Sequence, residues 1–478
     1  MNMSFWKPWS LFAPRTKLES HKMHVRSRAT RHFRGAKGDQ SAAYSALAVL
    51  LIAMIPMVAF ANDEIPGAPQ SKPIVLVGGT VHTVSGDTIA DGMVLFEKGR
   101  ITGVGKGLAL PANVQKIEVQ GKHVYPSFLD AHTQLGLVEI SSIRATIDSR
   151  EVGSFNPNVE SAVALNPDSE LLPVARANGI LLALATPTGG MISGRSSLIQ
   201  LDGWTFEELV VRKDIGMHMR WPSERSLSSD DSGEKSSSTP ETSKQSLHRF
   251  FEQARAYQQA RAAEPEKHAI DLRFDAMLPV LDKKLPVIVE ADELRQIQAA
   301  VGFALEQQIR IIIYGGYDAA DCAPLLIAHQ IPVIIGGTYR LPMRESDAYD
   351  ASYTLPDRLR RLGVEYCIAS VGKFAGTGVR NLPYHVANAA AFGLPVEDAL
   401  KSITLYPAQI LGVADRVGSL DTGKDATLFV CTGDPLDVDS SIEIAFVQGR
   451  RIELNDRHKR LWQKYEQKYQ ATGGAKRR

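Results

Sequence analysis

Cysteine is scarce in this chain of 478 residues. It occurs at Cys322, Cys367 and Cys431, and no two of these form a Cys-x-x-Cys pair. This scarcity excludes a disulfide-built scaffold and argues against a cysteine-built zinc or redox site. The chain is otherwise 44% hydrophobic and 22% charged, which is an ordinary globular composition with ample material for a large core.

An excess of charge of either sign is also missing, with 54 Lys and Arg residues against 53 Asp and Glu residues. This balance depends on residues 1–61, which hold nine of the basic residues and two of the acidic ones. Without them the chain has 45 basic and 51 acidic residues, a net charge of −6. A mildly acidic chain of this kind is not expected to bind nucleic acid.

The first 61 residues have the features of an export signal. A basic region precedes the uncharged apolar run AAYSALAVLLIAMIPMVAF, which closes on Ala59-Phe60-Ala61. This order predicts a signal peptide cleaved after Ala61, and therefore a periplasmic or extracellular protein without stable membrane association. The alternative is an uncleaved anchor, because the run approaches the roughly 20 residues that a membrane span needs.

Strand-like runs at both ends of the remaining chain predict one small β-sandwich built from residues 62–124 and 415–455. Between them, over 125–414, apolar β-branched runs alternate with helical patterns at 293–307, 318–329 and 354–362. This alternation predicts a parallel sheet covered on both faces, closed into a TIM-like β/α barrel that interrupts the sandwich. A doubly wound open sheet is the alternative, but the glycine-rich phosphate turn that it would favour is missing.

Two further segments have compositions of their own. Residues 223–246 are serine-rich and nearly free of apolar side chains, so we expect a disordered insertion there, followed by a helix from about Leu247 to Ala263. The last segment, 456–478, is expected to form a helix and a basic tail. The spacing of Leu461, Tyr465 and Tyr469 predicts that this helix docks by one face.

The segment YPSFLDAHTQLGL, residues 125–137, carries the most specific signal. Its apolar run ends in Asp130, His132 and Gln134, and on a strand this spacing of two places the three side chains on one face. A second histidine in place of Gln134 would complete a metal-binding His-x-His pair. An isolated strand histidine is otherwise most often a satisfied core residue.

The segments PSFLDAHTQLG and GSLDTGKDATL, together with the divided sandwich, resemble the amidohydrolase superfamily, in particular its imidazolonepropionase-like and dihydroorotase-like branches. The resemblance extends from about Pro73 to Leu454. It implies a barrel whose mouth holds one or two divalent metals, and hydrolysis of carbon–nitrogen bonds in small amide-like substrates. In such families the ligands come from the ends of several strands, and an aspartate on strand eight also transfers the proton.

Several expected ligand positions are altered. His132 matches the first histidine, Gln134 stands where the second is expected, and Glu290 and Tyr314 end strands where histidine or lysine is usual. Glutamate can bind a metal and a tyrosine hydroxyl can hold an oxyanion. Glu290 has a second interpretation, as an acidic residue near the start of a helix.

The strand-eight aspartate is absent, because Ser370 and Val371 occupy its place. We therefore expect at most one weakly bound divalent metal, most naturally zinc, with His132, Gln134 and Glu290 as its ligands. Tyr314 and Arg380 are candidate substrate-binding residues, although Arg380 fits an ordinary surface ion pair equally well. His218 and His385 are weaker candidates that the sequence does not rank, and no catalytic residue is assigned.

Two functions remain open at this point. The first is an exported hydrolase acting on carbon–nitrogen bonds of cyclic or other non-peptide amides, or of small peptides, with a reduced metal centre. The second is a degenerate relative that binds a ligand or partner at the barrel mouth without hydrolysis. A small-molecule substrate and a possible homo-oligomer are expected with the first.

Overall fold

The structure is a computed structural model that describes residues 65–223, 239–370 and 376–471. The expected signal peptide, residues 1–61, lies outside these ranges, as do residues 224–238 of the expected insertion. The described residues all belong to one compact unit, the body of the chain.

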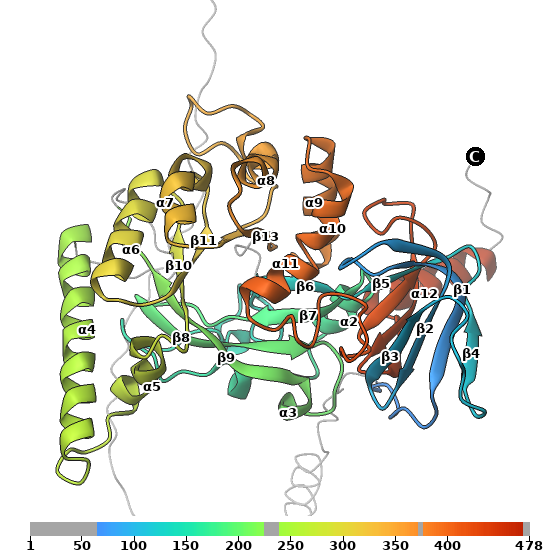
Figure 1. Ribbon diagram of the computed structural model, residues 1–478, viewed down its shortest axis with the longest axis horizontal. Coiled ribbons are helices and arrows are strands. Elements are labelled where there is room, and N and C mark those ends of the chain that lie inside the picture. The colour runs from blue at the N-terminus through green and yellow to red at the C-terminus, as the bar shows by residue number, and fades with distance from the viewer. Residues whose placement is uncertain (1–64, 224–238, 371–375, 472–478) are drawn as a thin grey trace, which may run out of the picture. The chain divides into compact units, whose positions relative to one another are not determined.

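The two ends of this body share one β-sheet. Its strands run in the order β16-β15-β14-β5-β1-β2-β3, with β4 paired to β1. Their bounds are β1 (Ile74–His82), β2 (Thr88–Glu97), β3 (Arg100–Gly105), β4 (Gln115–Glu118), β5 (His123–Pro126), β14 (Leu428–Cys431), β15 (Ile442–Val447) and β16 (Arg450–Ile452). Strands β5 and β14 pair antiparallel with Tyr125 opposite Phe429, so blue and red strands lie side by side in Figure 1. The predicted sandwich of the two chain ends is confirmed.

Side chains from both ends fill the core of this sandwich. Leu76 and Phe96 from the first strands are buried together with Leu428 and Phe446 from the last ones. The rings of Phe96 and Phe446 meet edge to face, with their centroids 5.0 Å apart. Removing either end would therefore expose the apolar face of the other.

A second sheet of eight strands, in the order β6 to β13, forms the barrel. Its strands are β6 (Phe128–Thr133), β7 (Ile180–Ala185), β8 (Ile192–Gln200), β9 (Val210–Arg220), β10 (Val287–Ala291), β11 (Ile311–Gly315), β12 (Val333–Ile335) and β13 (Tyr366–Ile368). Strand β8 runs antiparallel to both β7 and β9, whereas the other ladders are parallel. The predicted barrel is thus present in a distorted form, and the expectation of an entirely parallel sheet is wrong at β8.

One end of the barrel is closed by apolar packing. Leu184, Ile288 and Ile334 belong to a buried cluster that also contains Val413 and Val417 from the segment after the last barrel helices. Barrel enzymes place their sites at the other end, formed by the carboxyl ends of the parallel strands.

Helices and 3-10 turns connect these strands. They are η1 (Arg144–Thr146), η2 (Ser161–Ala164), α2 (Leu171–Arg176), α3 (Phe206–Leu209), α4 (Pro240–Ala263), α5 (Leu272–Leu281), α6 (Leu294–Glu306), η3 (Ala319–Cys322), α7 (Ala323–Ala328), α8 (Ala351–Leu362), η5 (Val379–Asn381), α9 (Leu382–Ala391), α10 (Val396–Lys401), α11 (Leu405–Ile410) and α12 (Arg457–Ala471). Within the described ranges, no helix has the length and apolar character needed to cross a bilayer.

Helix α4 starts earlier than its composition suggests. It begins at Pro240, so residues 240–246, predicted to be part of the insertion, are helical. The Thr239 side chain accepts the N–H of Thr242, and proline at the first helical position needs no hydrogen-bond acceptor. These local signals outweigh the polar composition that favoured disorder.

Helix α12 forms where predicted, but the predicted docking of its face is wrong for the described residues. Leu461, Tyr465 and Tyr469 are 41%, 50% and 61% exposed. The helix joins the body near its beginning, where Arg460 lies 3.1 Å from Glu170 of the segment preceding α2.

Candidate functional site at the barrel mouth

His132 lies at the end of β6, in contact with a ring from another strand. Its imidazole stacks on Tyr314 of β11, with centroids 3.5 Å apart and planes 10° from parallel. Both side chains are buried, with 8% of each residue exposed. The structure therefore brings together two of the residues that the sequence singled out.

His218 on β9 joins this pair. Its ring centroid is 5.5 Å from that of His132. Among the described residues, neither Nδ1 of His132 nor Nε2 of His218 has a hydrogen-bond partner, although both atoms are buried. Buried polar atoms are nearly always paired, so two unpaired imidazole nitrogens in one place indicate a site for a water, an ion or a ligand.

The charge state of these rings follows from burial. Desolvation lowers the pKa of His132 to about 3, and it lowers the pKa of His218 well below its usual value, with repulsion from His132 as a second cause. Both imidazoles are therefore neutral near pH 7. A neutral imidazole has a lone pair that can bind a metal ion or accept a proton.

Asp130 lies directly before this pair and is fully buried. Its Oδ1 accepts the backbone N–H of His132 at 3.2 Å and that of Ser370, just after β13, at 3.1 Å. Its Oδ2 has no partner among the described residues. Burial raises the pKa of Asp130 to about 6, against the lowering effect of hydrogen bonds from Ser370 and His132. This carboxyl group thus connects the first and last strands of the barrel.

Tyr314 supplies a hydrogen-bond donor to the same region. Burial raises the pKa of its hydroxyl above the usual value, with nearby Glu290 as the next cause. The hydroxyl therefore stays protonated, which is the form that can donate to a carbonyl oxygen or an oxyanion.

Charged pairs surround these buried groups. Glu290 lies beside Tyr314 across the β10–β11 ladder and is 3.3 Å from Nε of Arg220, with its side chain 54% exposed. Asp292, two residues further on, accepts hydrogen bonds from both terminal guanidinium nitrogens of Arg340, each at 2.8 Å. The rim therefore offers both signs of charge to a polar substrate.

Of the remaining predicted residues, Arg380 and His385 have other roles, and Gln134 lies two positions after His132. Gln134 is half-buried in the turn after β6. Its backbone carbonyl accepts hydrogen bonds from the backbone N–H groups of Leu137 and Val138. Arg380, in η5, contacts His458 of α12 at 3.3 Å, and among the described residues no hydrogen bond or ion pair joins it to His132 or His218. His385 is buried, and its Nδ1 accepts the backbone N–H of Thr338 at 3.1 Å, which is a structural role.

The barrel mouth offers few ligands for a metal ion. A catalytic zinc site uses three protein ligands and keeps one position open. In the described ranges, no three His, Cys, Asp or Glu side chains gather closely enough to hold an ion. The two imidazoles of His132 and His218 alone do not fit a tight three-ligand centre.

Sequence reasoning left two members of this site without a role. The sequence identifies Asp130 only by its spacing from His132, and it does not rank His218 above the other histidines. The signal for His218 lies in the strand register, because it pairs with Ile288 and thus shares the face of β10 that points into the barrel. That pairing is not readable from one sequence.

Comparison with known proteins agrees with this architecture. The model of the Amidohydrolase family matches residues 350–453. An imidazolonepropionase from Mesorhizobium japonicum is 24% identical over 411 residues, which cover 78% of this chain and 95% of that protein.

Solved structures share the fold over most of the body. An amidohydrolase from Thermotoga maritima MSB8 superposes with a TM-score of 0.73 and 25% identity, covering 80% of this chain and 99% of its own. A Xaa-Pro dipeptidase with bound methionine in the active site gives a TM-score of 0.51 at 15% identity, covering 80% of this chain and all of its own, and so shares the fold alone. By sequence and by fold, the body of the chain is thus similar to the amidohydrolase superfamily of hydrolases.

Proposed function

We propose that this protein is exported and hydrolyses a carbon–nitrogen bond of a small, cyclic or otherwise non-peptide amide at the barrel mouth. One observation carries the proposal. Asp130 Oδ2, His132 Nδ1 and His218 Nε2 are buried in an amidohydrolase-like barrel, and no described residue pairs with any of them. Unsatisfied polar groups of this kind are costly in free energy and persist where a ligand or a reaction uses them.

The residues divide into three roles in this proposal. The neutral rings of His132 and His218 orient the attacking water through their buried nitrogens and accept its proton, which then passes to the leaving nitrogen. The Tyr314 hydroxyl donates a hydrogen bond to the carbonyl oxygen as charge develops on it. At the rim, Arg220 and Glu290 bind polar groups of the substrate, which matches an amide with charged substituents.

A divalent ion, with zinc as the first choice, remains part of the proposal as a weakly held group. The described imidazoles supply two good ligands, one fewer than a catalytic zinc site requires. Glu290 is engaged by Arg220, and Gln134 offers only an amide oxygen, a poorer ligand for such ions. We infer that occupancy depends on the zinc concentration supplied.

Export rests on residues 1–61, whose basic region, apolar run and Ala59-Phe60-Ala61 end describe a cleavable signal. Sequencing the amino terminus of protein from the producing cell tests it. A start at about Asn62 supports export, whereas a chain that still begins near Met1 in the envelope fraction contradicts it.

The hydrolysis itself is tested by offering the purified chain a panel of cyclic amides, acylated amino acids and dipeptides, with and without added zinc. The reaction is run in water labelled with heavy oxygen and followed by mass spectrometry. Hydrolysis places one heavy oxygen in the product carboxyl group. No labelled product from any amide, at any zinc concentration, would overturn the proposal.

The second candidate, ligand binding without hydrolysis, is favoured by one observation. Ser370 follows β13, and the sequence from Tyr366 to Ala375 contains no Asp, Glu or His that could transfer a proton. A panel compound that raises the melting temperature without being converted would support this candidate.

A further inference from the structure

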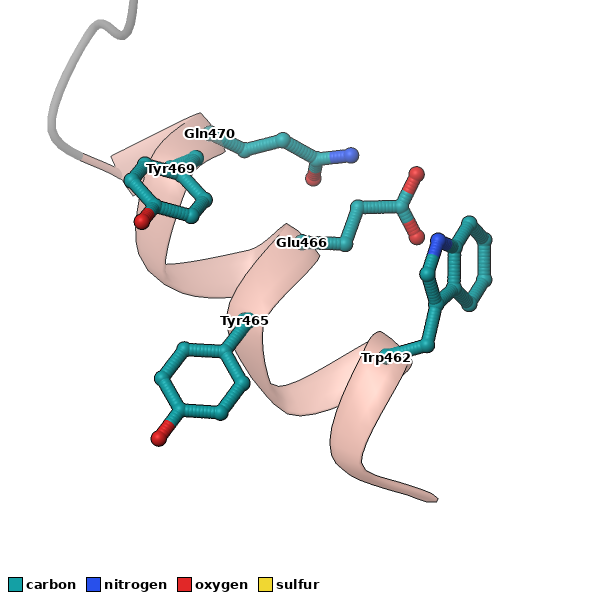
Figure 2. Close-up of a pocket in the computed structure, with 5 residues that line it drawn as sticks. All are labelled: Trp462, Tyr465, Glu466, Tyr469 and Gln470. Carbon is teal, nitrogen blue, oxygen red and sulfur yellow. The ribbon is translucent and has the colours of Figure 1, made fainter. Parts of the chain in front are cut away.

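Helix α12 presents an exposed aromatic face. Every residue from Leu461 to Gln470 is exposed, and Trp462, Tyr465 and Tyr469 are 63%, 50% and 61% exposed. Figure 2 shows the two tyrosines extending to one side of a shallow pocket and Trp462 to the other; the lining residues all belong to α12. With 3.6 residues per turn, Leu461, Tyr465, Tyr469 and Trp462 fall within an arc of about 100°, so the tyrosines and Trp462 flank one face of the helix.

The charge of this helix is predominantly positive. It contains five Lys and Arg residues, namely Arg457, Lys459, Arg460, Lys464 and Lys468, against the single carboxylate of Glu466. The Lys468 ammonium lies 5.9 Å from the centre of the Tyr465 ring and 5.8 Å from that of Tyr469. Cations thus border the aromatic face along its length, in a chain whose other residues, without the leader, are net acidic.

We propose that α12 attaches this protein reversibly to an anionic lipid surface. Trp462, Tyr465 and Tyr469 would lie among the lipid headgroups, where amphipathic aromatic rings are favoured. Lys464 and Lys468 would lie beside lipid phosphates. The helix is too short and too charged to span a bilayer, so it lies on the surface and gives reversible rather than stable association.

Charge decides between this surface and a second copy of the chain. Two α12 helices packed face to face would bring together Lys464 and Lys468 of both copies, and juxtaposed like charges disfavour such an interface. An anionic surface neutralises the same cations. A helix of 15 residues with little packing against its own body is also marginal in water, so a surface that binds its aromatic side stabilises it.

Sedimentation with lipid vesicles tests the proposal, using the chain as purified from the producing cell. At low salt we expect it to sediment with vesicles of phosphatidylglycerol and phosphatidylcholine, and not with phosphatidylcholine alone. Binding should fall as salt is raised, because exposed charges are screened.

Variants separate α12 from the rest of the chain. Replacing Trp462, Tyr465 and Tyr469 by alanine together should abolish sedimentation, and Lys464→Gln with Lys468→Gln should weaken it roughly fivefold for each lost cation. The matched control replaces Gln463 and Gln467, on the other side of the same helix, by alanine and should bind as the parent does. Melting temperatures should stay equal throughout, because all these side chains are exposed.

Three results would overturn the proposal. One is the absence of sedimentation with anionic vesicles at low salt, and another is unchanged sedimentation of the aromatic variant. The third is a concentration-dependent dimer in ultracentrifugation that the aromatic variant abolishes, because the face would then bind a second copy.

Discussion

His385 should make the protein lose stability in mild acid, by an amount that the structure allows us to work out. This residue of α9 is 4% exposed, and its Nδ1 accepts the backbone N–H groups of Thr338 at 3.1 Å and Tyr339 at 3.3 Å. Protonation would remove this acceptor and place a charge in the interior. Burial accordingly lowers the pKa of His385 from 6.5 to about 4.

The direction of the pH effect follows from this shift. The unfolded chain takes up the proton below about pH 6.5, whereas the folded chain takes it up only near pH 4, so acid favours unfolding between these values. The contribution of His385 to the free energy of unfolding is complete above pH 6.5. At 1.36 kcal/mol per pKa unit, it falls by about 1 kcal/mol at pH 5.5 and by about 3 kcal/mol at pH 4.5.

Urea unfolding at several pH values, followed by circular dichroism, measures this contribution in the variant His385→Asn. The asparagine oxygen can accept the same N–H groups but does not titrate. We expect the variant to be less stable than the parent at pH 7.5 and to lose about 3 kcal/mol less on acidification. His268→Asn, at an exposed histidine, is the control and should follow the parent. Equal pH dependence in parent and His385→Asn would refute the reasoning.

Three further predictions concern the contacts between the sandwich and the barrel, and the binding of zinc. Asp202→Ala should cost about 3–5 kcal/mol in urea unfolding, because the buried carboxylate pairs with Arg176 of α2 at 3.1 Å and Arg450 of β16 at 3.2 Å; a loss below 1 kcal/mol would show that these pairs do not stabilise the fold. Gly179→Ala should lower the melting temperature more than Gly363→Ala does, because both glycines have φ of +80° but only at Gly179 would a Cβ lie 2.9 Å from the Phe429 ring. Equal melting temperatures would contradict this. Gln134→His should raise the zinc content found by elemental analysis, by adding a third imidazole near His132 and His218; an unchanged content would show that position 134 does not face the site.

Much of the fold was predictable because it depends on patterns of several residues. Continuous apolar runs such as Ile180–Ala185 are buried on both sides, as alternation with helices implies. The pairing of the chain ends followed from β-rich runs that would otherwise leave open edges. The reversed direction of β8 was not predictable, because strand direction depends on the path of the connection and leaves no periodic trace.

The site was predictable only in part. His132 was found through its neighbours in YPSFLDAHTQLGL, and Tyr314 through its place at a strand end. His218 had no such context, and its role emerges only from the ring contact with His132, 86 positions away in the chain. Asp130 was visible, but its link to Ser370 is a tertiary contact over 240 positions.

The exposure of α12 likewise could not be read from its periodicity. The spacing of Leu461, Tyr465 and Tyr469 predicts an amphipathic helix but does not identify what its apolar side contacts. The structure shows that side exposed in the described chain.

The measurement closest to the central claim compares turnover of the best panel substrate by the parent, His218→Ala and His268→Ala, together with their melting temperatures. The Nε2 of His218, for which the described ranges offer no partner, is the part of the site that the structure alone revealed. We expect His218→Ala to keep its fold and to lose at least a hundredfold in kcat, as removal of a group that positions the reacting water should cost, while His268→Ala retains the parent value. Full turnover by a folded His218→Ala variant would contradict the assignment of the reaction to the group formed by Asp130, His132 and His218.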